Sequence, residues 1–267
     1  MFTITPLSTG RVAIKQAMRR PPGAGPRRRT AMLLPGPMTE ALPIHAWVIE
    51  HPDGLILVDA GETHAARDQL FATFHVGRED ELDHALRAAG YAPSEIGTVV
   101  LTHIHGDHVG GLPHVPEARV LASADELRFA LGAGGRIQRR IARQPLPPGF
   151  HAEPLALDGP AFGAFAASAP LTADGRVVAV PAPGHTVGHL AVVVVQDDHH
   201  VLLGGDSAYD QAQLVDRHPD GVSPKASVAR GTMDTILEHA RRHPTVYLPS
   251  HDLESATRLR DGATLAA

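Results

Sequence analysis

The sequence predicts an α/β fold, an αββα sandwich in which two mixed β-sheets pack face to face with helices on the outside. Apolar, β-branched segments predict the strands of the two sheets, one group between residues 45 and 123 and another between 177 and 250. Segments with helical spacing are interspersed in both groups, and no linker separates them. We therefore expect residues 1–267 to form a single domain.

The first group opens with a hairpin, in which residues 45–50 and 55–61 are strands joined by the turn HPDG. A helix is expected over 79–89, followed by a buried strand over 98–102 and another strand over 118–123. Ser123 and Glu126 predict a capping box at the start of a helix over 125–131. A further helix over 136–143 should end before the prolines at 145, 147 and 148.

The second group repeats this scheme. Residues 176–186, 189–195 and 201–206 predict successive strands, with a turn over 197–200. Ser223 and Pro224 suit the N-cap and first position of a helix that runs towards Arg242. Residues 245–250 predict the last strand, which ends at His251.

The N-terminal residues 1–40 lack this regularity and are expected to form a partly flexible region of substrate loops. Within them, residues 19–29 (RRPPGAGPRRR) should be a solvated loop, because prolines and glycines interrupt both helix and strand. The alternative is an arm that touches phosphate or a membrane.

Composition excludes several classes of chemistry. The chain has no cysteine, so disulfides, thiolate metal sites and a cysteine nucleophile are excluded, and a bound metal must use imidazole and carboxylate ligands. A net charge of −5 gives no broad attraction to nucleic acid or anionic membranes, and nucleic acid is not expected as a partner. No apolar segment is long enough to span a bilayer, and we expect a cytoplasmic protein.

Histidines and aspartates gather where predicted strands end. The motif THIHGDH provides four candidate ligands within six residues, which is enough to serve two adjacent cations. Three further candidates follow later strands, in PAPGHT, LLGGDS and YLPSHD. A polar loop that is merely rich in histidine is the alternative. The predicted ligands are His103, His105, Asp107, His108, His185, Asp206 and His251.

The motifs HxHxDH, GHTxGH, GGD and SHD, preceded by VDAG, together resemble the metallo-β-lactamase superfamily from about His45 onwards. The resemblance implies two divalent metal ions at the sheet edges. The first would be held by His103, His105 and His185, the second by Asp107, His108 and His251, and Asp206 would bridge them. Around the ligands, orienting roles would fall to Asp59, His189 and Asp252, although His189 could be purely structural.

Within the superfamily the sequence is most similar to the N-acyl homoserine lactonases. The segment 78–111 resembles their helix, connector and metal loop, Tyr209 follows Asp206 by three residues, and Asp252 follows His251. A β-lactamase is disfavoured by the missing cysteine ligand, and a flavin-linked di-iron protein by His105, where those proteins have glutamate. The expected absence of a C-terminal substrate domain and of a large insertion disfavours glyoxalase II and the nucleases.

The hypothesis is therefore a dinuclear hydrolase that opens a lactone ring, with a metal-bridging hydroxide attacking the carbonyl carbon. Tyr209 would donate a hydrogen bond to the oxyanion, and Asp107 would return a proton to the leaving alkoxide. The alternative for Tyr209 is a packed residue at a strand end. Zinc is the favoured metal, while iron, manganese and cobalt suit similar ligands. A homodimer would be unsurprising.

The substrate contacts and the reaction class are less restricted by the sequence. An apolar wall for an acyl chain is expected from Met32, Leu33, Leu34, Met38 and Trp47, with ordinary packing as the alternative. The same metal centre could act on another lactone, an aryl ester or a phosphotriester. A persulfide dioxygenase and a non-catalytic metal-binding scaffold are the remaining alternatives.

Overall fold

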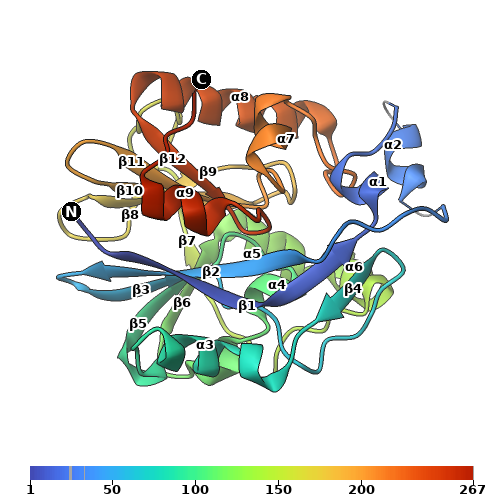
Figure 1. Cartoon of the computed structure of the whole chain (residues 1–267), viewed down its shortest axis with the longest axis horizontal. Helices are drawn as coiled ribbons and strands as arrows, with labels where there is room; N and C mark the ends of the chain where they lie inside the picture. Colours follow the sequence, from blue (N-terminus) through green and yellow to red (C-terminus); the bar gives the residue numbers. More distant parts are fainter. Residues whose placement is uncertain (24–25, 33, 267) are drawn as a thin grey trace.

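A computed structural model describes residues 1–23, 26–32 and 34–266, and it confirms the sandwich of two sheets with outer helices (Figure 1). Among the described residues the larger sheet has the strand order β4-β1-β2-β3-β5-β6-β7, with bounds β1 Ile4–Ile14, β2 Leu42–His51, β3 Gly54–Val58, β4 Ala72–His75, β5 Ile96–Val100, β6 Arg119–Ser123 and β7 Glu153–Leu155. The smaller sheet has the order β12-β11-β10-β9-β8, with bounds β8 Ala169–Pro170, β9 Val177–Pro181, β10 Leu190–Val195, β11 His200–Gly205 and β12 Thr245–Pro249.

The helices cover the outer faces, with α3 beyond the larger sheet and α8 beyond the smaller one (Figure 1). The α-helices are α1 Gln16–Arg19, α2 Pro26–Ala31, α3 Leu82–Ala88, α4 Gly106–Val109, α5 Ala124–Leu131, α6 Ala133–Ala142, α7 Gln211–Val215, α8 Ala226–Arg242 and α9 Ser255–Asp261. Short 3-10 turns lie at η1 Arg78–Asp80, η2 Pro93–Glu95 and η3 Leu112–His114. In the described parts of the chain, none of the helices combines the length and apolar character needed to cross a membrane.

The core between the sheets explains the long apolar runs in the sequence. In β10, Leu190, Val192 and Val194 pack against the larger sheet, whose inward side chains include Trp47. The alternate residues of β10 pack towards α8 instead, in a cluster that contains Ile236. Because both faces of this strand are buried, its sequence LAVVVV is apolar throughout rather than alternating.

The predicted strands of the two central groups are confirmed, while β1 was missed. β1 pairs with β2 in antiparallel register, but the register shifts between Ser8 and Arg11, where Gly10 has φ +105°. Such an irregularity breaks the alternation of apolar and polar residues by which a strand is recognised in sequence. The short strands β4, β7 and β8 also carry too few residues to give a periodic signal.

Three local predictions need correction. Residues 19–29 are not loop throughout, because α2 begins at Pro26, a residue compatible with a helix N-terminus. α8 begins at Ala226 rather than after Ser223, whose amide and hydroxyl instead bond to Asp220. The capping box of α5 is only half formed, since the Ser123 hydroxyl accepts from the Glu126 amide while the Glu126 carboxylate bonds elsewhere.

Strand direction brings distant segments to one edge of the sandwich. β3, β5 and β6 are mutually parallel, and in the smaller sheet β11 and β12 are parallel to each other and to β9. The residues that follow β5, β9, β11 and β12 therefore emerge at the carboxyl ends of their sheets. All seven predicted ligands lie in these segments.

Candidate metal centre

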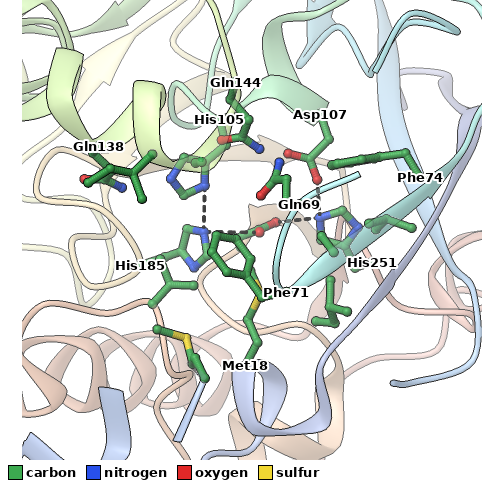
Figure 2. A pocket seen from close by; sticks show the side chains of 18 of the residues that line it. Met18, Gln69, Phe71, Phe74, His105, Asp107, Gln138, Gln144, His185 and His251 are labelled. Atoms are coloured by element: carbon green, nitrogen blue, oxygen red, sulfur yellow. Dashed lines mark hydrogen bonds and ion pairs between the residues drawn. The ribbon is translucent and has the colours of Figure 1, made fainter. Parts of the chain in front are cut away.

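Five of the seven predicted ligands line a pocket of about 380 Å³ (Figure 2). His105, Asp107 and Asp206 are in its lining, together with His185 and His251. The walls are mainly apolar and include Val12, Ile14, Met18, Phe71, Phe74, Ile137 and Ile141. A polar floor under an apolar wall is typical of a small-molecule site.

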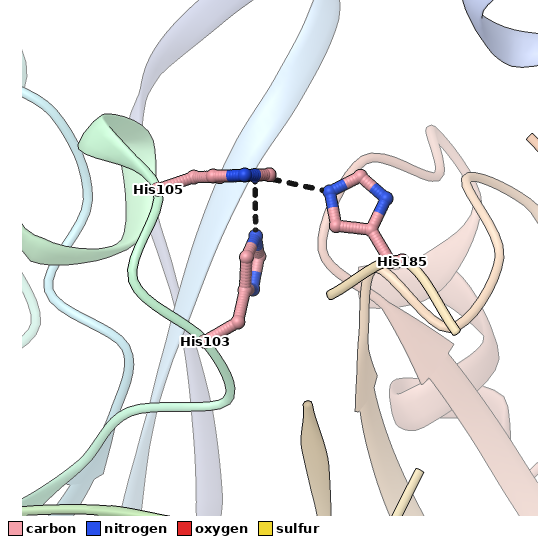
Figure 3. Close-up of side chains that lie close together, drawn as sticks. All are labelled: His103, His105 and His185. Atoms are coloured by element: carbon pink, nitrogen blue, oxygen red, sulfur yellow. Dashed lines mark hydrogen bonds between the residues drawn. The ribbon is translucent and has the colours of Figure 1, made fainter. Parts of the chain in front are cut away.

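Three imidazole nitrogens converge in a first cluster (Figure 3). His103 Nε2 lies 2.9 Å from His105 Nδ1, and His185 Nε2 lies 3.0 Å from the same His105 atom. Tetrahedral ligand nitrogens about 2 Å from a zinc ion would be roughly 3.3 Å apart, close to these spacings. The cluster can therefore hold one divalent cation.

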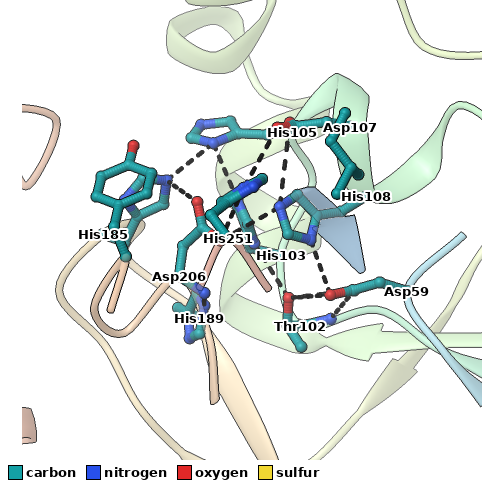
Figure 4. Close-up of polar contacts among 12 residues, drawn as sticks. Asp59, Thr102, His103, His105, Asp107, His108, His185, His189, Asp206 and His251 are labelled. Atoms are coloured by element: carbon teal, nitrogen blue, oxygen red, sulfur yellow. Dashed lines mark hydrogen bonds and ion pairs between the residues drawn. The ribbon is translucent and has the colours of Figure 1, made fainter. Parts of the chain in front are cut away.

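A second cluster lies beside the first. Its ligand-type atoms come from Asp107, His108 and His251, and Asp107 Oδ2 lies 3.5 Å from His251 Nε2. Asp206 stands between the clusters, with Oδ1 3.4 Å from His108 Nε2 and Oδ2 3.4 Å from His185 Nε2. The structure thus brings all seven predicted ligands together, with Asp206 facing both groups (Figure 4).

The hydrogen bonds around the clusters test whether these side chains fit metal ions. The outward Nδ1 of His108 bonds to Asp59 at 2.8 Å, that of His185 to Asp220 at 2.8 Å, and that of His251 to the carbonyl of Pro43 at 2.8 Å. Each acceptor holds the proton on Nδ1 and leaves the inward Nε2 as a lone pair. Within the described part of the chain, His108 Nε2 and Asp206 Oδ1 are buried without a hydrogen-bond partner, as expected of atoms that bind a cation.

Asp59, one of the residues predicted to orient the ligands, lies at the centre of one of these networks. Its carboxylate accepts from the Thr102 amide at 2.8 Å and from the Thr102 hydroxyl at 2.9 Å, besides the bond from His108. Because that hydroxyl donates to Asp59, its oxygen can accept from His103 Nδ1, 3.1 Å away. One buried carboxylate therefore orients a histidine of each cluster (Figure 4).

His189 and Asp252 act on backbone rather than on ligand side chains. His189 Nε2 accepts from the Asp206 amide at 3.0 Å, and a Cβ on Gly205, which has φ +52°, would come within 2.7 Å of this ring nitrogen. The bare glycine therefore lets the ring approach the chain at Asp206. Asp252 bonds to the Gln211 amide and to Arg258, and so fastens the loop after Tyr209 to α9.

Sequence reasoning missed Asp220 and Glu126. Asp220 lies in the loop before α8, where no periodic pattern or motif marked it, although its neighbour Ser223 is the residue we assigned to the helix cap. Glu126 is 2 % exposed and accepts from the amides of Ile104 and Gly188 at 3.1 and 3.0 Å. It thereby ties together the two loops that carry His103, His105 and His185.

The electrostatics of the centre favour a cation. Burial lowers the pKa of His108, but the carboxylates of Asp59 and Asp206 outweigh it and raise that pKa well above its usual value. The pKa of His185 is raised in the same way, against burial, by Asp220 and Asp206. By contrast, burial and the neighbouring His185 lower the pKa of His105 to about 3. Excess negative charge thus surrounds the point at which the imidazoles converge.

Tyr209 lies beside this centre and lines the same pocket. The residue is 2 % exposed, and its ring lies 5.9 Å from that of His185 and 5.6 Å from that of His251. Its hydroxyl has no hydrogen-bond partner among the residues that the structure describes. Burial and the carboxylates of Asp206, Asp220 and Asp107 raise its pKa well above 10, which keeps the proton on the oxygen. A buried, unused donor therefore faces the pocket.

The predicted substrate wall is largely wrong. Met32 lines the pocket, but Trp47 is 1 % exposed and is packed between the sheets, because its strand turns that side chain inward. Leu34 and Met38 are 62 % and 37 % exposed and do not line the pocket. Leu33 lies outside the described residues. The apolar wall comes instead from β1, the segment around Phe71, and α6.

Comparison with known proteins identifies the family. The chain matches the sequence profile of the Metallo-beta-lactamase superfamily over residues 39–251, a span that contains every predicted ligand. The chain belongs to this superfamily. Its membership confirms both the fold class and the expected metal-dependent hydrolase.

Superfamily relatives cover nearly the whole chain. The probable metallo-hydrolase Rv2300c of Mycobacterium tuberculosis is 34 % identical over 284 residues, covering 95 % of this chain and 90 % of the relative. An N-acyl homoserine lactonase of Bacillus thuringiensis is 25 % identical and covers 85 % of this chain and 88 % of its own. The solved structure of an N-acyl homoserine lactone hydrolase, with N-hexanoyl-L-homoserine bound at the catalytic metal center, aligns with a TM-score of 0.72 at 19 % identity, covering 98 % and 96 % of the two chains.

Proposed function

We propose that this superfamily member hydrolyses the ring ester of a lactone, with N-acyl homoserine lactones as the substrate class. The observation that carries the proposal is the Tyr209 hydroxyl, which has no hydrogen-bond partner among the described residues and belongs to a residue that lines the same apolar pocket as five of the seven metal-type ligands. The similarity to N-acyl homoserine lactonases supports it. A polar head at the floor and an acyl chain along the wall would match this division of the pocket.

The ligands fit two divalent cations, for which zinc is the favoured element given imidazole and carboxylate donors without thiolate. His103, His105 and His185 would hold one ion, Asp107, His108 and His251 the other, and Asp206 would contribute to both. When bound, such ions supply Lewis acidity and a water of lowered pKa.

The chain's own groups would act on the ester as follows. The Tyr209 hydroxyl donates a hydrogen bond to the carbonyl oxygen as negative charge develops on it, and the raised pKa keeps this donor protonated. Asp107, which lines the pocket, takes up the proton lost by the attacking water and returns it to the alkoxide released when the ring opens. The apolar wall that includes Phe71 and Ile137 holds the acyl chain and limits access of bulk water.

The test is ring opening by the metal-loaded protein, measured by pH-stat on N-acyl homoserine lactones with acyl chains of increasing length. Each turnover releases one carboxylic acid, so base uptake reports the reaction directly. Tyr209→Phe removes one oxyanion donor and should lower kcat by about 10²-fold, with little change in KM.

Tyr91→Phe is the matched control, because the Tyr91 hydroxyl bonds to Glu50 and Thr5, outside the pocket. It should retain wild-type kcat, and Tyr209→Phe should retain the wild-type metal content. Aryl esters, other lactones and a phosphotriester are assayed in parallel. If none of the acyl homoserine lactones is opened while one of these compounds turns over, the substrate class proposed here is wrong.

A further inference from the structure

Positive charge is unevenly distributed along the chain. Twelve of the 24 lysines and arginines lie in two segments, residues 1–39 and 127–152, and neither segment contains an aspartate or glutamate. The other twelve share the rest of the chain with all 29 acidic residues. The net charge of −5 therefore conceals two strongly basic segments, which the bulk composition did not reveal.

The two basic segments border the same pocket. Met18 and Met32 of the first segment and Ile137 and Ile141 of the second are among its lining residues. Figure 1 shows α2 and α6 at the same end of the molecule, on the right of the view. In the first segment Arg19 and Arg20 pair with Asp210 and Asp216, so the unpaired positive charge lies on the α6 side of the pocket.

In the second segment Arg128 pairs with Asp125, whereas the four arginines that follow it have no ionic partner among the described residues. Arg136, Arg139, Arg140 and Arg143 line a groove of about 360 Å³ beside the pocket, and in the described structure none of them forms a salt bridge. Arginines on other surfaces are paired, such as Arg119 with Glu153. Four guanidinium groups without a counter-charge form a surface complementary to an anionic partner.

Large aliphatic side chains are exposed at the same rim. Ile137 and Ile141 are 62 % and 76 % exposed, and Leu70, between the pocket-lining Gln69 and Phe71, is 65 % exposed. On α6 the isoleucines lie on the pocket side and the arginines on the groove side. An apolar face beside a basic face is typical of helices that lie at a membrane–water interface.

We propose that α6 docks on the surface of an anionic lipid bilayer. Ile137 and Ile141 would enter the interface, while the long arginine side chains reach the headgroups. The exposed aliphatic residues favour a bilayer over nucleic acid, because single-stranded nucleic acid is bound by aromatic stacking and α6 has no aromatic residue. Docking would turn the pocket mouth towards the lipid. The membrane-docking proposal does not depend on the proposed function.

The experiment is co-sedimentation of the full-length, metal-loaded protein with vesicles of phosphatidylglycerol and phosphatidylcholine in equal parts, and with vesicles of phosphatidylcholine alone. We expect binding to the anionic vesicles only, weakened by about 0.5 M NaCl. R136E/R140E should weaken binding by about tenfold or more, and I137S/I141S should weaken it although the arginines remain.

The matched control is R242E/R260E, which reverses two exposed charges on α8 and α9. It should bind as the wild type does, and R136E/R140E should keep the wild-type Tm. The proposal is overturned if the wild type does not sediment with anionic vesicles, or if R136E/R140E and the control behave alike. Arginine-dependent binding to a DNA duplex without vesicle binding would assign the surface to nucleic acid instead.

Discussion

Replacing Asp206 with alanine is expected to lower kcat/KM for the best lactone substrate by about 10³-fold or more. Asp206 faces both clusters, with Oδ1 3.3 Å from His251 Nε2 and Oδ2 3.4 Å from His185 Nε2. Its loss therefore weakens both metal sites at once rather than one. Steady-state kinetics, together with the metal content of the purified variant, measure the effect.

The control for this variant is Asp198→Asn, which removes a surface carboxylate whose side chain is 76 % exposed. It should retain wild-type kinetics and metal content. An Asp206→Ala protein with two tightly bound ions and near-wild-type turnover would show that Asp206 is not a shared ligand.

The second large effect is expected when the carboxylate of Asp59, which bonds to the metal-ligand candidate His108, is replaced by an amide. Asn at position 59 tolerates the observed φ of +60°, but its amide must place an N–H donor against His108 or Thr102, which are donors themselves. We expect Asp59→Asn to weaken metal binding by roughly 10–100-fold and to lower the free energy of unfolding by about 3 kcal/mol. Zinc titration of the metal-free variant and its denaturant unfolding measure the two effects.

Asp220→Asn makes the corresponding change at the carboxylate that bonds to His185. It should lower the zinc affinity of the first cluster. Asp174→Asn is the matched control, because Asp174 bonds to His51 at 3.0 Å in a carboxylate–histidine pair outside the pocket. It should leave zinc affinity unchanged. If the Asp59 and Asp220 variants bound zinc at both clusters with wild-type affinity, the orienting role of these carboxylates would be contradicted.

The ligand set was predictable because each ligand follows an apolar strand in a short, distinctive motif. Strand direction then brings the four segments to one edge, so chemistry that is scattered in sequence converges in space. The hairpin and the central strands were predictable for a related reason, since both faces of strands such as β10 are buried and their sequences are uniformly apolar.

The supporting residues were not predictable by the same reasoning. Glu126 has the spacing of a helix cap, and only the folded chain shows that its carboxylate binds the amides of Ile104 and Gly188. Asp220 comes from a loop without regular spacing, and the pocket wall comes from β1 and α6 through long-range packing. Such roles depend on which segments meet in three dimensions, and local sequence patterns carry little information about that.

Zinc titration of the metal-free wild-type protein tests the central claim most directly. We predict two tightly bound ions per chain. The apparent affinity should fall as pH falls, because His108 and His185, whose pKa values are raised in the metal-free protein, must release protons when a cation binds. Binding of less than one ion per chain at saturating zinc and neutral pH would contradict the metal centre and the hydrolase mechanism built on it.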